Sequence, residues 1–161
     1  MTGQEAREYV VLLHGDEAVW READEATRLQ AFATHGEFTR LCGERGHTIT
    51  GGAELAESAT SHVVRLGPDR TPRVTEGPFT ETVEQLGGYY VIETADVADL
   101  AQLVAMLIDD DSGVVEIRPA VPASEQPTPD ELADVEPTSG QTTSAQPTTM
   151  QPTTIQPGAG S

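Results

Sequence analysis

The chain has 161 residues, of which 37% are hydrophobic, so it is long enough for one domain with a core and too short for two ordinary domains. Its 27 Asp and Glu residues outnumber the 9 basic residues, all of them Arg, and the net charge of −18 disfavours nucleic acid as a direct partner. The single cysteine, Cys42, excludes an intramolecular disulfide framework, as is typical of a cytoplasmic protein. We expect no membrane association, because the sequence has neither an apolar run of spanning length nor a signal-peptide pattern.

The first part of the chain predicts a strand followed by a long helix. Tyr9–Leu13 is apolar throughout, and His14–Glu17 follows it, where Gly and Asp favour a turn. A helix is predicted from about Asp24 to Glu44, and Gly46 stands just beyond its end as a stop. Four strand-like segments come next, each bounded by Gly, Pro or Asp: His47–Leu55, Ser61–Leu66, Arg73–Thr75 and Gly88–Glu93.

A second helix and a last strand complete the pattern. The helix is predicted from about Val97 to Asp109, with Asp96 as its N-cap. Apolar residues recur in it at the spacing of one buried face, namely Val97, Leu100, Ala101, Val104, Leu107 and Ile108. The final strand is Val114–Ile117, and Pro119, which has no N–H to donate to a ladder, ends it.

The order of these elements predicts an α+β domain. Two helices separated by strands match the ferredoxin-like split βαβ arrangement, in which both helices cover one face of an antiparallel sheet. The first strand and Tyr89–Ile92 are apolar at successive positions, so both of their faces prefer to leave water. No third helix is available to cover the second face. A second copy packed sheet on sheet is the simplest cover, and we therefore expect a homodimer.

Residues 122–161 differ from this domain, which we assign to residues 1–121. They contain no aromatic residue, and a short repeat, Gln-Pro-Thr-Thr, begins at Gln146 and again at Gln151. Such a composition cannot bury enough apolar surface to fold. We predict a disordered, acidic tail rich in Pro, Thr and Gln.

Several blocks, in order along the chain, resemble a known family. They are Tyr9–Glu17, Glu76–Phe79 with Glu81 and Thr82, Gly87–Tyr90, and Val115–Pro119. Together they resemble the YCII-related, or DGPF, domain family. The resemblance implies a ferredoxin-like fold of the dimeric α/β-barrel superfamily, with two sheets face to face and a pocket between sheet and helices. It also implies a small bacterial protein, of a kind often encoded near extracytoplasmic-function sigma factors and mostly without an established reaction.

The chain departs from the family pattern at positions that bear on function. Glu76 stands where the motif has Asp, Val83 where a Lys is common, and His14 where an aromatic residue usually ends the first strand. By resemblance, His35 occupies the place of a His proposed to form a catalytic dyad with an Asp. The Asp-Pro-Tyr setting of that Asp is absent, and Asp109–Asp111 lie nearby without the matching neighbours.

His35 is the candidate catalytic residue. On a helix it shares a stripe with Ala31, Phe38 and Cys42, and a His beside apolar neighbours can act as a general acid or base near neutral pH. The alternative is a hydrogen-bonded core or interface histidine. Cys42 has no activating partner beyond His35, so we expect an inert buried thiol.

Four further residues are candidates for the wall of a ligand pocket: His14, Asp16, Glu81 and Tyr89. His14 ends a strand, and Asp16 can orient its ring. Glu81 follows the Gly-Pro turn and can present a carboxylate to a pocket. Alternation along a strand sends Tyr89 and Tyr90 to opposite faces, and the sequence leaves open which of them offers its hydroxyl.

Other residues are expected to be structural. Glu76–Phe79 predicts a tight turn with Phe79 anchored in the core. His47 and His62 are expected to be ordinary strand or surface residues. We expect no bound metal, because the four histidines show no i, i+4 pair and no thiolate cluster exists, and no cofactor, because no phosphate-binding or dinucleotide fingerprint occurs.

Two hypotheses about function remain open. The first is a dimeric accessory protein that binds a small apolar or aromatic ligand, linked by resemblance to sigma-factor regulation. The second is a small cofactor-independent enzyme that uses His35 as acid or base in the barrel pocket. An enzyme needs His35 beside a cavity and a polar partner, whereas a pure interaction module allows its ring to be sealed by packing.

Overall fold

The structure is a computed structural model, and it describes residues 5–108, 113–133 and 135. The chain forms two compact units, residues 1–127 and 128–161. Within the described residues, the first unit has these elements in chain order: β1 (Arg7–Asp16), α1 (Glu17–Glu22), α2 (Glu25–Glu44), β2 (Thr48–Glu54), η1 (Ser58–Thr60), β3 (His62–Leu66), β4 (Pro72–Glu76), β5 (Glu84–Thr94), α3 (Val97–Val104), η2 (Ala105–Leu107), β6 (Val114–Pro119) and η3 (Ala123–Glu125).

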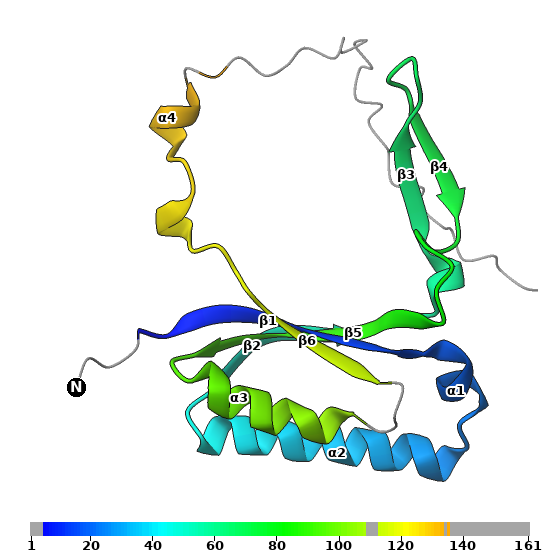
Figure 1. The fold of residues 1–161 in the computed structure, drawn as a ribbon, viewed down its shortest axis with the longest axis vertical. Helices are drawn as coiled ribbons and strands as arrows, with labels where there is room; N and C mark the ends of the chain where they lie inside the picture. Colours follow the sequence, from blue (N-terminus) through cyan, green and yellow to red (C-terminus); the bar gives the residue numbers. More distant parts are fainter. Residues whose placement is uncertain (1–4, 109–112, 134, 136–161) are drawn as a thin grey trace, which may run out of the picture. The chain divides into compact units, whose positions relative to one another are not determined.

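A four-stranded sheet with the order β2-β5-β1-β6 forms the centre of the first unit. Its three pairings, β2 with β5, β5 with β1, and β1 with β6, are all antiparallel. Helices α2 and α3 lie on one face of this sheet (Figure 1). Two helices on one face of an antiparallel sheet, with the first strand inserted beside the last, is the ferredoxin-like plan. The predicted fold class is confirmed.

Helix α2 begins and ends where the sequence predicts. The Asp24 carboxylate accepts a hydrogen bond from the Thr27 N–H at 2.8 Å, which satisfies one of the free N–H groups at the helix start. Gly46 follows the helix with φ of 83°, a left-handed conformation that glycine adopts without strain. The predicted stripe of the helix is its buried face, with Ala31, Phe38 and Cys42 against the sheet.

Helix α3 is shorter than predicted. Asp96 caps it through a hydrogen bond from the Asp99 N–H at 2.9 Å, as expected, but after Val104 the backbone tightens into η2. At the two ends of the predicted face Val97 and Ile108 are 37% and 41% exposed. Asp109, where the predicted helix ends, lies outside the described residues.

The core lies between the sheet and the two helices. Its centre is apolar and nearly closed to solvent, and the residues of the cluster are Val11, Phe38, Cys42, Ile92, Leu100, Leu103, Val104 and Leu107. Val11 and Ile92 come from the two central strands, so the best-packed region sits under β1 and β5. Burying this apolar surface is the main favourable term that holds the helices on the sheet.

Helix α1 was not predicted. Where the sequence indicates a turn, β1 continues as far as Asp16, and α1 starts at the next residue. The Asp16 carboxylate accepts a hydrogen bond from the Ala18 N–H at 2.8 Å and so caps α1. Both oxygens of Glu17 then accept hydrogen bonds from Ser58, from its backbone N–H at 2.6 Å and from its hydroxyl at 2.7 Å, which ties α1 to η1.

Strands β3 and β4 form a separate two-stranded sheet, not part of the central one. The expectation that Phe79 is anchored in the core is wrong, because its side chain is 75% exposed. Phe79 belongs to the connection between β4 and β5, and its ring lies 5.6 Å from the guanidinium carbon of Arg65 on β3. A cation over an aromatic face accounts for this contact without burial.

His47 is buried, contrary to the expectation of an ordinary strand or surface residue, with 3% of the residue exposed. Its Nδ1 lies 2.8 Å from the Thr94 hydroxyl and its Nε2 lies 3.0 Å from an Asp99 carboxylate oxygen, and Arg45 also donates to Asp99. Desolvation raises the pKa of Asp99, but hydrogen bonds from Arg45 and His47 outweigh this and hold the pKa below its usual value. The network fastens α3 to the start of β2.

Short helical segments occur in the part of the chain predicted to be a tail. These are η3 in the first unit and α4 (Pro129–Ala133) in the second. The Gln-Pro-Thr-Thr repeat lies outside the described residues.

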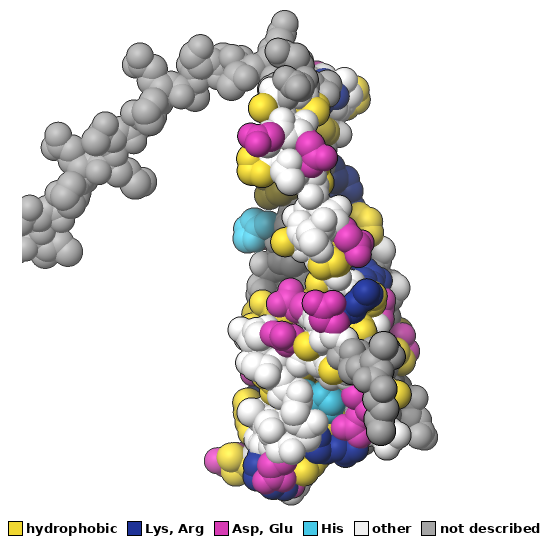
Figure 2. Space-filling view, turned by 90° about the vertical axis from the view of Figure 1, so that its left-hand side faces the viewer, with side chains coloured by type: hydrophobic (Ala, Val, Ile, Leu, Met, Phe, Trp, Pro, Cys, Tyr) yellow, Lys and Arg dark blue, Asp and Glu magenta, His cyan; other side chains and the backbone are white. Residues whose placement is uncertain are grey.

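Acidic side chains, in magenta, recur among hydrophobic ones on the molecular face in Figure 2. None of the helices in the described residues is long and apolar enough to cross a membrane.

Candidate functional site

A cavity of about 420 Å³ lies between the sheet and helices α1 and α2. Its walls come from β1, β2 and β5 on one side and from α1, α2 and η2 on the other. Much of the surface is apolar, supplied by Leu13, Trp20, Ala31, Phe32, Leu55 and Leu107. Trp20 and Phe32 meet edge to face, with ring centroids 6.4 Å apart, and thereby join α1 to α2 at the cavity wall. Its volume falls in the range of sites that hold small molecules.

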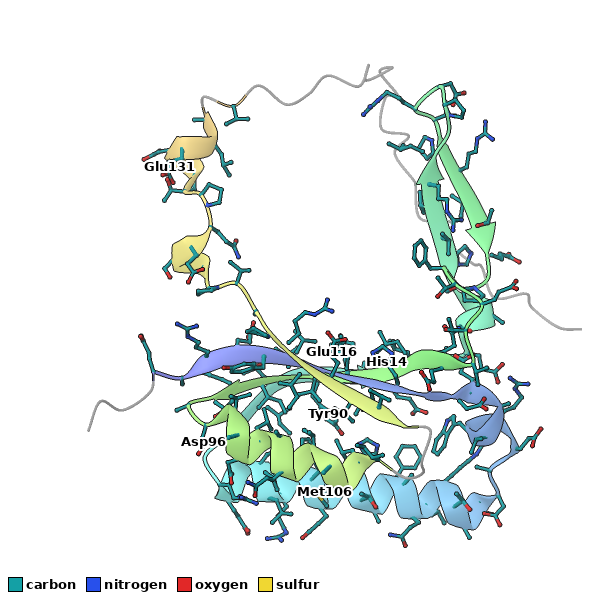
Figure 3. All side chains as sticks on the ribbon, in the orientation of Figure 1. His14, Tyr90, Asp96, Met106, Glu116 and Glu131 are labelled. Carbon is teal, nitrogen blue, oxygen red and sulfur yellow. The ribbon has the colours of Figure 1, made fainter. Side chains whose placement is uncertain are left out.

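His35 and Tyr90 form a hydrogen-bonded pair in this cavity. Nδ1 of His35, on α2, lies 2.7 Å from the hydroxyl oxygen of Tyr90, on β5. Tyr90 is paired with Val11 and so faces the helices, as Figure 3 shows. The Phe38 ring, one turn along α2 from His35, packs 5.2 Å from the Tyr90 ring and holds it in place. Both members of the pair line the cavity.

The surroundings of this pair keep the tyrosine protonated. Burial, and to a smaller extent repulsion from the thiolate form of Cys42, raise the pKa of Tyr90, so its hydroxyl is a neutral phenol at physiological pH. Burial also raises the pKa of Cys42 to about 11, and the thiol is fully buried, in line with the expected inert role. A neutral phenol can donate its proton to Nδ1 or accept one from it. The pair can therefore present either a donor or an acceptor at Nε2 of His35.

Three of the four predicted pocket residues adjoin the cavity. His14, Asp16 and Tyr89 are in its wall, together with the candidate catalytic residue His35. Glu81 is not; it is exposed in the connection between β4 and β5. Tyr89 pairs with Leu12, so strand alternation directs its side chain to the face of the sheet opposite the helices.

Sequence reasoning missed part of the site. The sequence indicates a turn where α1 begins, and so it gave no reason to select Trp20. Phe32 was also not predicted to line the cavity. Sequence reasoning left Tyr90 undecided against Tyr89. A signal for Tyr90 was present, because His35 shares the stripe of Phe38, which faces the sheet, and Tyr90 has the same parity as Ile92 in β5. The acids Asp109–Asp111, considered as partners of His35, lie outside the described residues.

Comparison with known proteins identifies the family. The model of the YCII-related domain matches residues 8–124, which covers β1 to β6. No curated protein matches the chain. The matched region contains the central sheet except Arg7, both covering helices and the cavity with its His35–Tyr90 pair. The chain belongs to the YCII-related domain family.

Proposed function

We propose that this protein is a small-ligand-binding homodimer whose ligand occupies the cavity between the sheet and helices α1 and α2. The observation that carries the proposal is the His35–Tyr90 hydrogen bond inside an otherwise largely apolar cavity. A polar pair that only stabilised the core would be sealed by packing. This pair instead faces a space of about 420 Å³, where it can orient a compact apolar ligand through one hydrogen bond.

An NMR titration of the His35 ring tests ligand binding. We expect its signals, assigned by their loss in His35→Gln, to move with one class of compound in a library of small apolar amines, alcohols, phenols and carboxylic acids. Tyr90→Phe removes the hydrogen bond that orients the His35 ring. It should weaken binding of that compound about fivefold, because one hydrogen bond contributes about 1 kcal/mol. His62→Gln, on the exposed face of β3, is the matched control and should leave binding unchanged. A ring that no compound perturbs would make the pair structural.

Acid or base catalysis without a cofactor is the second candidate function. It is favoured by the same geometry, since His35 has a polar partner at 2.7 Å and lies beside a cavity. With Nδ1–H donating to Tyr90, Nε2 can accept a proton from a ligand; in the other tautomer Nε2–H can donate one. Turnover of a compound that binds in the titration, lost in His35→Gln and retained in His62→Gln, would select this candidate over simple binding.

The dimeric part of the proposal concerns the other face of the sheet. Strand pairing places Val10 opposite Val91 and Leu12 opposite Tyr89 there, away from the helices. All four are only partly buried in the single chain. Glu116, next to Leu12, and Arg118, next to Val10, lie on the same face and form an ion pair with each other at 2.5 Å, which offsets their charges beside the apolar centre. A second copy packed on this face would remove the apolar centre from water.

Sedimentation velocity of the full chain tests the dimer. We expect a species of about twice the 17.1 kDa chain mass over a wide concentration range. Val91→Arg, which puts a charge at the apolar centre of the face, should reduce the species to the single chain. Gln102→Arg adds the same charge on the exposed side of α3 and should leave the dimer intact. Wild-type protein that sediments as a monomer throughout would contradict the proposal. The link to sigma-factor regulation rests on the family resemblance and stays a prediction.

A further inference from the structure

The charged groups around the cavity are nearly all of one sign. Four carboxylates line it, those of Asp16, Glu17, Glu54 and Glu57, while no Arg is among the lining residues and the chain contains no Lys. The wall includes two histidines, but alternation along β1 places His14, like Leu12, on the face of the sheet opposite the helices, so His35 is the basic side chain that faces the cavity (Figure 3). A space with several carboxylates beside low-dielectric apolar walls attracts cations and repels anions.

The four carboxylates differ in the hydrogen bonds and ion pairs that they already form within the protein. Both oxygens of Glu17 are engaged by Ser58, and one oxygen of Asp16 caps α1. Glu57 lies 3.4 Å from the guanidinium of Arg21. For the side chain of Glu54, the described residues show no hydrogen bond or ion pair. Glu54 therefore offers a carboxylate whose charge is not offset by a neighbouring residue.

Strand pairing places Glu54 on the face of the sheet that the helices cover. Glu54 in β2 pairs with Gly88 in β5, and Gly88 pairs with Leu13 in β1. Paired residues share a face, and Leu13 packs against the core, so Glu54 is on the helix side. Gly88 and Leu13 also line the cavity. The Glu54 carboxylate thus stands at the edge of the same space that contains the His35–Tyr90 pair.

The aromatic wall suits the same kind of ligand. The faces of Trp and Tyr rings attract cations, and Trp20 and Tyr90 line the cavity. Arg28 already lies over the Trp20 ring, 5.6 Å from its centroid, and donates to the backbone carbonyls of Trp20 and Arg21, but it is not a lining residue. The apolar remainder of the wall favours a hydrocarbon body attached to the charged group.

We infer that the ligand is a compact amine, with an ammonium group at the carboxylate of Glu54 and an apolar or aromatic body between Phe32 and the His35–Tyr90 pair. This inference rests on the proposed function and names the ligand class of the same cavity. One N–H of the ammonium donates to the Glu54 carboxylate and another donates to Nε2 of His35, the hydrogen bond by which the pair orients the ligand, while the apolar body lies beside Phe32.

Three compounds of similar shape and different charge test the inference on the full chain: 2-phenylethylamine, 2-phenylethanol and 3-phenylpropanoate. Calorimetry and the His35 ring signals should show the amine binding about tenfold more tightly than the alcohol, and the carboxylate more weakly still. Glu54→Gln should weaken the amine about fivefold and leave the alcohol unchanged, because an exposed ion pair contributes up to about 1 kcal/mol. Glu81→Gln, which removes an acid outside the cavity wall, is the matched control and should change neither.

The outcomes separate this inference from the function on which it rests. Binding of the alcohol or the carboxylate as tight as that of the amine, or a Glu54→Gln variant with unchanged amine affinity, would overturn the amine assignment and leave ligand binding standing. If none of the three compounds binds, the amine assignment also fails. If, in addition, no member of the wider library perturbs His35, the proposed function fails with it.

Discussion

Replacing Phe38 by alanine should lower the free energy of unfolding by about 3–5 kcal/mol, the usual cost of removing a buried phenylalanine ring. Phe38 is fully buried in the centre of α2 and packs against Tyr90. Its loss leaves a cavity that the sheet and α3 cannot fill without moving. The measurement is urea denaturation of wild type and variant, followed by circular dichroism.

Phe32→Ala is the matched control for Phe38→Ala, since it removes the same ring from the same helix. Phe32 is 57% exposed and meets Trp20 edge to face at the cavity wall. We expect a change in unfolding free energy of at most about 1 kcal/mol, together with weaker binding in the cavity. Equal destabilisation by the two variants would show that the packing of α2 on the sheet differs from that described.

Gly52→Ala should also destabilise the fold, by about 1–3 kcal/mol, because it forces a side chain where the backbone leaves no room. Gly52 has φ of 156°, and a Cβ there would lie 2.7 Å from the carbonyl oxygen of Tyr89 and 3.0 Å from Cδ1 of Tyr90. The strand would have to move away from β5. That movement would disturb the Tyr90 ring and its hydrogen bond to His35. We therefore expect shifted NMR signals of the His35 ring and a lower urea concentration at the midpoint of unfolding.

Gly51→Ala provides the comparison for Gly52→Ala at the neighbouring position. A Cβ on Gly51 would meet Cγ2 of Val91 at 3.6 Å, an ordinary van der Waals contact. Alanine in a position that it can occupy reduces the entropy of the unfolded chain, so we expect stability equal to or slightly above that of wild type. A destabilised Gly51→Ala would indicate that β2 tolerates no side chain in this stretch, so the effect of Gly52→Ala would not be due to the contacts of Gly52 with Tyr89 and Tyr90 alone.

The elements with strong local signals could be predicted from the sequence. Asp24 and Asp96 are N-caps because their side chains satisfy free N–H groups of the next turn, and this preference is local. The stripe through Phe38 and Cys42 has the helical period of a buried face, and the structure packs this stripe against the sheet. These signals, with the order of strands and helices, were sufficient for the ferredoxin-like fold.

The features that the sequence did not predict depend on contacts between distant segments. α1 is only six residues long and is fixed in part by Glu17 binding Ser58. The burial of His47 requires Thr94 and Asp99 to reach it from β5 and α3. A single sequence contains no local pattern for such pairings. The candidate site shows the same division, since His35 could be chosen from its stripe, whereas the parity that Tyr90 shares with Ile92 identifies it as the partner only after β5 is placed beside β1.

The central position of β1 has a consequence for the synthesis of the protein. Of the strands in this sheet β1 is synthesised first, yet its partners, β5 and β6, are synthesised last, and Val11 pairs with Ile117. Contacts between such distant segments require a long loop to close before they contribute to stability. The nascent chain must therefore carry its apolar first strand unpaired through most of translation, and the domain can complete its sheet only after Pro119 has emerged.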